Sequence, residues 1–233
     1  MSYKLNAHQF NTQLQIIHEG LKDFIANVDN TYVSEYKDVD WSKADMETLL
    51  KMYWPRRSEL GHIHSDKAKL FIEICFEYKP KQMLEIGTMY GVSTRLLAAL
   101  AKRVGGHLTS IDAGKSPGVD QMLKEVNLFE TVTLVNEWSP WVTPNPTWDL
   151  DLLFIDGDHS LIAALTDYHY FNYFVKKGGI IAFDNMEILE VQQAVEIIKK
   201  RDPLEEIACM YGIAVFRKLT ERGEKYFQVI RNK

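Results

Sequence analysis

A glycine turn between a short apolar run and an amphipathic segment constrains the fold of this chain more than any other feature. Residues 81–86 form an apolar run that ends at Gly87, which is typical of a buried strand. Over residues 93–104, apolar side chains recur at three- and four-residue steps and predict a helix. Residues 107–111 predict a second strand, which ends on Asp112. The sequence therefore predicts a βαβ unit with a glycine turn after its first strand and a carboxylate after its second.

The residues around this turn favour one class of ligand over another. A dinucleotide site needs the pattern G-x-G-x-x-G, so that a pyrophosphate can approach the backbone, but Met89 takes the place of the second glycine. Glu85 would repel a phosphate and attract an ammonium group. S-adenosylmethionine has an amino group and a ribose but no phosphate, and Asp112 could accept hydrogen bonds from both ribose hydroxyls. The pattern therefore favours S-adenosylmethionine over NAD, with a purely structural turn as the alternative.

The motif Glu-Ile-Gly-Thr-Met-Tyr-Gly-Val-Ser, residues 85–93, resembles the glycine loop of class I methyltransferases. It is most similar to the catechol and caffeoyl-coenzyme A O-methyltransferase branch, where E-x-G-x-x-x-G-x-S is usual. The resemblance extends over residues 61–218 and implies an α/β fold, a Rossmann-like, doubly wound, seven-stranded and mostly parallel sheet whose last strand is antiparallel. It also implies that five loop residues bind the cofactor: Glu85, Gly87, Met89, Gly91 and Ser93.

Polar side chains also follow two later predicted strands. The apolar residues 150–155 lead into Asp156, and residues 180–183 lead into Asp184 and Asn185. Because parallel strands align their C-terminal ends at one edge of a sheet, we expect both clusters to meet the glycine turn. Two carboxylates and an amide oxygen favour Mg²⁺, Ca²⁺ or Mn²⁺ over zinc. The alternative is that Asp156 and Asp158 cap the next helix while Asp184 and Asn185 form a turn.

The joint spacing of the two clusters resembles the metal-binding pattern of divalent-cation-dependent O-methyltransferases. The resemblance implies Asp156, Asp184 and Asn185 as ligands, with Mg²⁺ the expected ion, and Asp156 is also an expected cofactor contact. The catechol branch has a lysine as general base three residues after the metal aspartate, whereas this chain has His159. The pattern Phe-Ile-Asp-Gly-Asp-His resembles instead the methyltransferases that modify sugars and other hydroxyls of bacterial secondary metabolites.

Four further residues complete the expected site. A histidine with a pKa near neutrality can accept a proton at physiological pH, so His159 is the expected general base and Asp158 the reserve. The alternative role of His159 is to start the next helix or to stack on adenine. After a third predicted strand, residues 132–135, the resemblance places Trp138 and Ser139 against the adenine.

Composition limits the partners and the location of the protein. The net charge of −5 argues against nucleic acid or an anionic membrane as the main partner. No apolar run approaches ~18 residues and residues 1–20 lack a signal-peptide pattern, so we expect a cytoplasmic protein without membrane contact. Cys75 and Cys209 lie in apolar runs and are predicted to be buried thiols, not a disulfide.

Residues 1–60 lie outside the resemblance and are expected to form a helical extension or lid, with the methyltransferase domain over residues 61–233. Apolar residues between Phe10 and Val28 recur with helical spacing, and a second helix is predicted around Met46 to Tyr53. The extension could cover the sheet, lie over the substrate or mediate contacts in the homodimer that we expect.

Together these features predict a metal-dependent O-methyltransferase that uses S-adenosylmethionine. The expected acceptor is a hydroxyl of a small molecule: a sugar, a polyketide or other secondary metabolite, or a catechol-like compound. An NAD-dependent oxidoreductase would share the βαβ unit, although Met89 and Glu85 argue against it. A methyltransferase that acts on a macromolecule would need a docking surface, and nothing in the sequence is basic enough for nucleic acid. A non-catalytic S-adenosylmethionine-binding protein is the third alternative, and it would follow if the metal site were incomplete.

Overall fold

The computed structural model describes residues 36–53, 65–115, 118–145 and 147–221. The chain divides into two compact units, residues 1–38 and residues 39–233. The predicted helix between Phe10 and Val28 lies outside the described residues. The helices and strands from Met46 onward all belong to the second unit.

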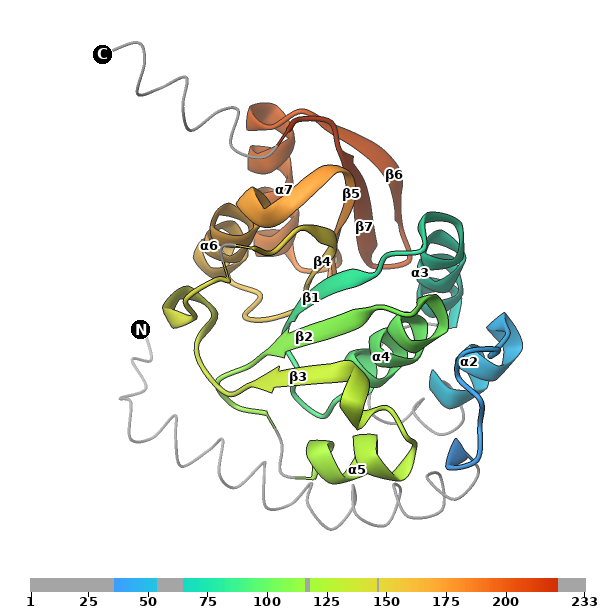
Figure 1. Cartoon of the computed structure of the whole chain (residues 1–233). Coiled ribbons are helices and arrows are strands. Elements are labelled where there is room, and N and C mark those ends of the chain that lie inside the picture. Colours follow the sequence, from blue (N-terminus) through green and yellow to red (C-terminus); the bar gives the residue numbers. More distant parts are fainter. Residues whose placement is uncertain (1–35, 54–64, 116–117, 146, 222–233) are drawn as a thin grey trace, which may run out of the picture. The chain divides into compact units, whose positions relative to one another are not determined.

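In the described part of the second unit, seven strands form one sheet in the order β3-β2-β1-β4-β5-β7-β6 (Figure 1). Strands β1 to β5 pair in parallel, and β7 runs antiparallel to both β5 and β6. This arrangement confirms the predicted doubly wound, mostly parallel sheet with an antiparallel last strand. The strands are β1 (Gln82–Ile86), β2 (His107–Ile111), β3 (Val132–Val135), β4 (Leu150–Ile155), β5 (Val175–Phe183), β6 (Leu204–Met210) and β7 (Ile213–Lys218).

Helices cover both faces of the sheet. Helix α4 packs on β1 and β2, with α3 beside it, while α6 packs on β4 and against α7 (Figure 1). None of the helices in the described residues combines the length and the apolar character needed to cross a membrane. The helices are α2 (Met46–Tyr53), α3 (Ser65–Tyr78), α4 (Val92–Val104), α5 (Val119–Glu125), α6 (Leu161–Phe171) and α7 (Leu189–Arg201), with short 3-10 turns at η1 (Phe129–Thr131), η2 (Ser139–Trp141) and η3 (Asn172–Phe174).

The central strands are apolar along their length because helices bury them on both sides. Residues 152–155 of β4 and residues 180–183 of β5 are all buried. Packing against both helix layers fixes the register in which the strands pair, since a one-residue slip would exchange the side chains between two differently packed layers. As a result the strand ends are level: Ile86 pairs with both Ile111 and Ile155, and Ile155 pairs with Phe183.

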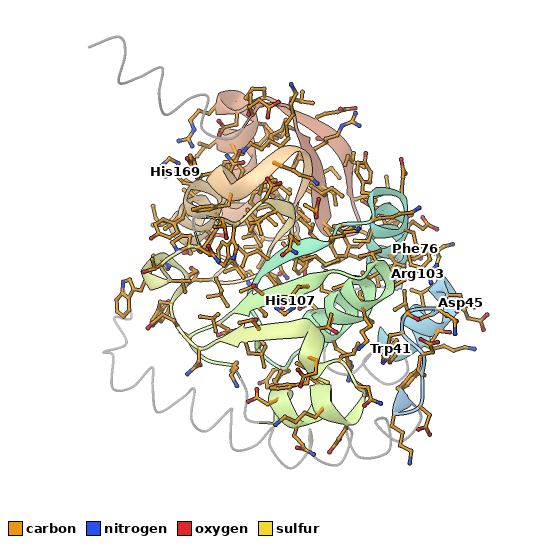
Figure 2. The ribbon with its side chains drawn as sticks, in the orientation of Figure 1. Trp41, Asp45, Phe76, Arg103, His107 and His169 are labelled. Carbon is orange, nitrogen blue, oxygen red and sulfur yellow. The ribbon has the colours of Figure 1, made fainter. Side chains whose placement is uncertain are left out.

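The segment before α3 packs on the helices of the same unit. The Trp41 side chain is buried and its Nε1 donates a hydrogen bond to the Val126 carbonyl at 2.7 Å. Arg103 donates to the Ala44 carbonyl at 2.6 Å, and its guanidinium lies 4.6 Å from the centre of the Phe76 ring (Figure 2). Helix α2 therefore contacts α3 and α4 within the unit of residues 39–233. The functional boundary at residue 60 stays a prediction.

Two local predictions were wrong. Strand β5 begins at Val175, not at residue 180, because Val175 already pairs with Leu150 before a register shift. Gly179 fits inside this irregular strand because a Cβ there would lie only 2.8 Å from a Val175 methyl. Cys209 is exposed, since it lies on the edge strand β6, whereas Cys75 is buried as predicted.

Candidate active site

The residues that follow four parallel strands lie side by side at one edge of the sheet. Gly87, Asp112, Asp156 and Asp184 come directly after β1, β2, β4 and β5. Gly87, Asp156 and Asp184 each donate a backbone N–H to the last residue of a neighbouring strand, at 2.9, 2.8 and 3.0 Å. The structure thus brings the glycine turn and both polar clusters together, as the strand pattern predicted.

Two glycines shape the turn after β1. Gly87 has a φ of +105°, and a Cβ there would overlap the carbonyl oxygen of Asp156. Gly91 has a φ of +73° and a Cβ would lie 2.9 Å from the Met122 side chain. Between them Met89 also has a positive φ, +41°, and its side chain is exposed. Only glycine meets both requirements at Gly87, a positive φ and contact with a second backbone segment.

Asp112 connects the end of β2 to the same turn. Its Oδ2 accepts a hydrogen bond from the Met89 N–H at 2.7 Å, and its Oδ1 accepts one from the Gly114 N–H at 2.6 Å. Each carboxylate oxygen has a second lone pair. Asp112 is therefore held in place by backbone donors and keeps acceptor capacity for the two ribose hydroxyls that the sequence assigns to it.

Glu85 lies beneath the turn and is fully buried. Its Oε2 accepts hydrogen bonds from Thr94 Oγ1 at 2.7 Å and from Ser110 Oγ at 2.5 Å, so it joins β1, β2 and α4. Burial raises the pKa of Glu85 to about 7, and the hydroxyl donors oppose that rise. Its Oε1 has no partner among the described residues. The predicted contact with the cofactor's amino group stays a prediction, and Oε1 is the atom that could make it.

Sequence reasoning missed the two hydroxyl partners of Glu85. Thr94 lies on the buried face of α4, and Ser110 is buried in β2. A serine or threonine at a position that faces an apolar core indicates that its hydroxyl has a buried hydrogen-bond partner. The sequence shows such positions, but it does not identify which carboxylate is the partner. The fifth loop residue, Ser93, is also buried at the start of α4.

His159 lies next to the first strand-end carboxylate. Its Nε2 is 3.6 Å from Asp156 Oδ1, which is an ion-pair distance but too long for a hydrogen bond. The Asp156 carboxylate raises the pKa of His159, with burial acting in the opposite direction. Burial, together with the carboxylates of Asp184 and Glu85, raises the pKa of Asp156. Burial and the neighbouring carboxylates therefore disfavour the charged form of Asp156 more than His159 stabilises it.

Asp158, the reserve base, takes part in the start of α6. Its Oδ1 accepts a hydrogen bond from the Ser160 N–H at 2.8 Å, and the Ser160 hydroxyl caps α6 by accepting from the Ala163 N–H at 3.3 Å. Ser160 and not Asp158 therefore caps α6, and the Asp158 carboxylate instead holds the turn before the helix. His159, one residue later, carries no such backbone contact in the described hydrogen bonds.

Asp184 forms a buried ion pair that the sequence did not suggest. Lys67 Nζ, from α3, lies 2.5 Å from Asp184 Oδ1, and the two side chains are 6% and 3% exposed. Burial raises the pKa of Asp184, and the Lys67 ammonium opposes this. Lys67 stands four residues before Phe71, on the buried stripe of α3. A lysine at a core position of a helix is the signal that could have revealed it.

The predicted ligand set fits a hard divalent cation in part. Asp156 and Asp184 follow adjacent strands, and their mutual repulsion would be relieved by a cation. Asn185 Nδ2 donates to Glu187 at 3.3 Å, which leaves the amide oxygen for an ion. One oxygen of Asp184 is already paired with Lys67. The described residues contain no group of three or more His, Cys, Asp or Glu that could hold a metal ion, and the predicted set has only two carboxylates plus an amide.

Trp138 and Ser139 occupy the loop after β3. The Trp138 side chain is exposed, whereas the Ser139 hydroxyl donates a short hydrogen bond to the carboxylate of Asp167. Asp167 lies on α6 and is buried, and burial raises its pKa to about 6. Sequence reasoning missed Asp167, because nothing in a helix sequence indicates which loop lies over it. Asp167 ties the predicted adenine loop to α6.

A sheet of this order, with a glycine turn after β1 and a carboxylate after β2, defines the class I methyltransferase fold. A family model described as a methyltransferase domain matches residues 84–186, from β1 to the turn after β5. Residues 84–186 are therefore similar to a methyltransferase domain, and the chain has the fold that the glycine motif predicted.

The similar proteins agree with this assignment. The chain is 29% identical over 122 residues to the uncharacterized protein R132 of Acanthamoeba polyphaga mimivirus, an alignment that spans 48% of this chain and 54%, about half, of that relative. The O-methyltransferase TomG of Streptomyces achromogenes, involved in tomaymycin synthesis and solved with SAM, is similar over 83% of this chain and 96% of its own, with a TM-score of 0.52 and 17% identity. An O-methyltransferase of Bacillus cereus solved with SAH is similar over 82% and 97%, with a TM-score of 0.55 and 17% identity. At these identities the two structures establish the fold.

Proposed function

We propose that this protein transfers a methyl group from S-adenosylmethionine to a hydroxyl group of a small molecule. The observation that carries the proposal is the meeting of Gly87, Asp112, Asp156 and Asp184 at the C-terminal edge of the sheet. Doubly wound folds bind their ligands at this edge. The methyltransferase family model and the neighbours solved with SAM and SAH support the choice of cofactor.

The turn after β1 and the end of β2 would bind the cofactor. Asp112 would accept hydrogen bonds from the ribose hydroxyls, and Gly87 and Gly91 would give the turn the positive φ values that shape it beside the cofactor. Glu85 would face the amino end, and the loop of Trp138 would lie against adenine. The other predicted contacts are Met89, Ser93, Ser139 and Asp156.

The methyl transfer would be a single in-line displacement. The acceptor oxygen attacks the methyl carbon, an O–C bond forms while the C–S bond breaks, and S-adenosylhomocysteine leaves. His159 is placed beside the strand-end carboxylates, where it would take the hydroxyl proton. A divalent cation held by Asp156, Asp184 and Asn185 would supply Lewis acidity that lowers the pKa of a bound hydroxyl.

The proposal includes the acceptor class, the location and the assembly. The proposed acceptor is a small molecule with a free hydroxyl: a sugar, a polyketide or another secondary metabolite, or a catechol-like compound. The involvement of TomG in tomaymycin synthesis supports a secondary metabolite as the acceptor. We place the protein in the cytoplasm as a homodimer. Light scattering on the purified full chain measures the assembly directly.

Binding and transfer can be tested separately. Calorimetry should show binding of S-adenosylmethionine and S-adenosylhomocysteine and none of NAD. A radiolabelled methyl group should then pass to a compound in a panel of hydroxylated metabolites. Binding of NAD instead would point to an oxidoreductase. Binding of S-adenosylmethionine without transfer, in an acceptor panel broad enough to cover these classes, would point to a binding protein.

A further inference from the structure

The ion pair between Lys67 and Asp184 places a protein cation at the proposed metal site. Lys67 Nζ lies 2.5 Å from Asp184 Oδ1 across a sequence separation of 117 residues. Both side chains are almost fully buried, 6% and 3% exposed. The contact is therefore not a solvated surface pair of the kind that contributes little. A buried charge is stable only when it is paired, so each member holds the other in place.

The turn between β6 and β7 encloses the lysine end. A Cβ at Gly212 would lie 3.3 Å from Lys67 Nζ and 2.5 Å from Glu187 Oε2. The Gly212 carbonyl accepts a hydrogen bond from the Met186 N–H at 2.9 Å, which fixes this turn against the segment after β5. The ammonium thus lies between the Asp184 carboxylate and a backbone turn that has glycine where a side chain would intrude.

We propose that Lys67 is an internal counter-cation of Asp184 that competes with the divalent ion and sets how tightly the site binds it. This inference rests on the metal ligands of the proposed function. An ion bound to Asp184 must either displace Lys67 from Oδ1 or share the carboxylate with it through Oδ2. In both arrangements a positive charge stands close to the ion, and like charges repel strongly where water is excluded. Removing the lysine charge should therefore tighten ion binding.

The test measures ion binding to the full chain without cofactor or acceptor. Mn²⁺ is the probe, because electron paramagnetic resonance distinguishes free from bound ion. Lys67→Met, which keeps an unbranched chain and removes the charge, should bind Mn²⁺ at least about tenfold more tightly than the unsubstituted protein. Its melting temperature should also rise more on addition of Mg²⁺, because ligand binding stabilises the folded state.

Two controls separate this effect from a general change of charge. Lys176→Met removes the same charge from a second Lys–Asp pair, with Asp151, at the other end of β4 and β5, and should leave Mn²⁺ affinity unchanged. Adding Asp184→Asn to Lys67→Met should abolish the gain. If Lys67→Met does not fold, Lys67→Gln keeps a neutral donor for Asp184 and carries the same expectation.

Unchanged or weaker Mn²⁺ binding in the folded Lys67 variant would overturn the inference. Tightening of Mn²⁺ binding by Lys176→Met to the same extent as by Lys67→Met would overturn it as well. Because the readout uses neither cofactor nor acceptor, these outcomes leave the proposed methyl transfer standing. Failure of the proposed function would be detected by a different measurement, calorimetry with S-adenosylmethionine. In that case neither the unsubstituted protein nor any variant would bind this cofactor.

Discussion

Asp112 accepts a hydrogen bond from the Met89 backbone N–H at 2.7 Å, and this contact joins the end of β2 to the turn after β1. The side chain that the sequence assigns to the ribose is therefore also a support of the loop that the cofactor would approach. Loss of its carboxylate should affect binding through both roles.

We expect Asp112→Ala to weaken S-adenosylmethionine binding by at least tenfold. Hydrogen bonds to a charged group contribute roughly 1.5–3 kcal/mol each, and the variant would lose the acceptor for two hydroxyls. Calorimetry measures the affinity. Asp45→Ala is the control, because Asp45 also accepts a backbone N–H, from Thr48 at 2.8 Å, but does so at α2. Equal affinities in the Asp112 variant and the unsubstituted protein would remove Asp112 from the site.

Removal of divalent ions should abolish methyl transfer, and Mg²⁺ should restore it. The physical reason is the cluster of Asp156 and Asp184, whose negative charge a divalent cation would compensate, together with the oxygen of Asn185. The measurement is the rate after exhaustive chelation, with metal analysis of the same sample. A full rate in protein shown to be free of metal would contradict this prediction.

His159→Ala should lower turnover by about 10²–10⁴-fold while cofactor affinity stays nearly constant. A base must be neutral to accept a proton, and Asp156 raises the pKa of His159 above the usual 6.5. The unsubstituted rate should therefore rise with pH through a value above 6.5, and this rise should disappear in the variant.

His169→Ala is the control for the loss of a histidine, because His169 lies further along α6, where its ring contacts Arg201. Its turnover and pH profile should match those of the unsubstituted protein. Normal turnover with weakened cofactor binding in His159→Ala would make His159 an adenine or loop contact. Asp158 would then be the next residue to test as the base.

Asp167→Asn should change how stability depends on pH. Burial raises the pKa of Asp167 from 3.8 to about 6, so between these values the folded protein keeps a proton that the unfolded chain has lost. The contribution of Asp167 to the free energy of unfolding therefore falls as pH rises through this window, by about 1 kcal/mol between pH 5 and pH 7. Denaturant unfolding of both proteins at the two pH values measures the difference. Parallel pH dependences would contradict the assignment.

Local sequence was sufficient for the central elements β1, α4, β2 and β4 and for the order in which the site residues follow the strands. The alternation of apolar runs with helical spacing predicted β1, α4, β2 and β4 near their observed bounds, because burial on both faces imposes a continuous apolar strand. Gly87 could be recognised for a different reason, which is that the turn after β1 needs a positive φ at this position. Residues that follow parallel strands must share one edge, so Asp112, Asp156 and Asp184 were predicted to meet.

Only the tertiary structure decided the partners of these residues. Lys67 and Asp184 are separated by 117 positions, and Ser139 and Asp167 by 28. Helical or strand periodicity indicates which face of an element is buried, but it carries no information on which buried polar group lies opposite. That choice depends on how α3 and α6 pack against the sheet, and a buried charge then takes the nearest group that can compensate it. The sequence alone therefore determined the fold and the edge where the site lies, whereas packing determined that Asp184 pairs with a lysine.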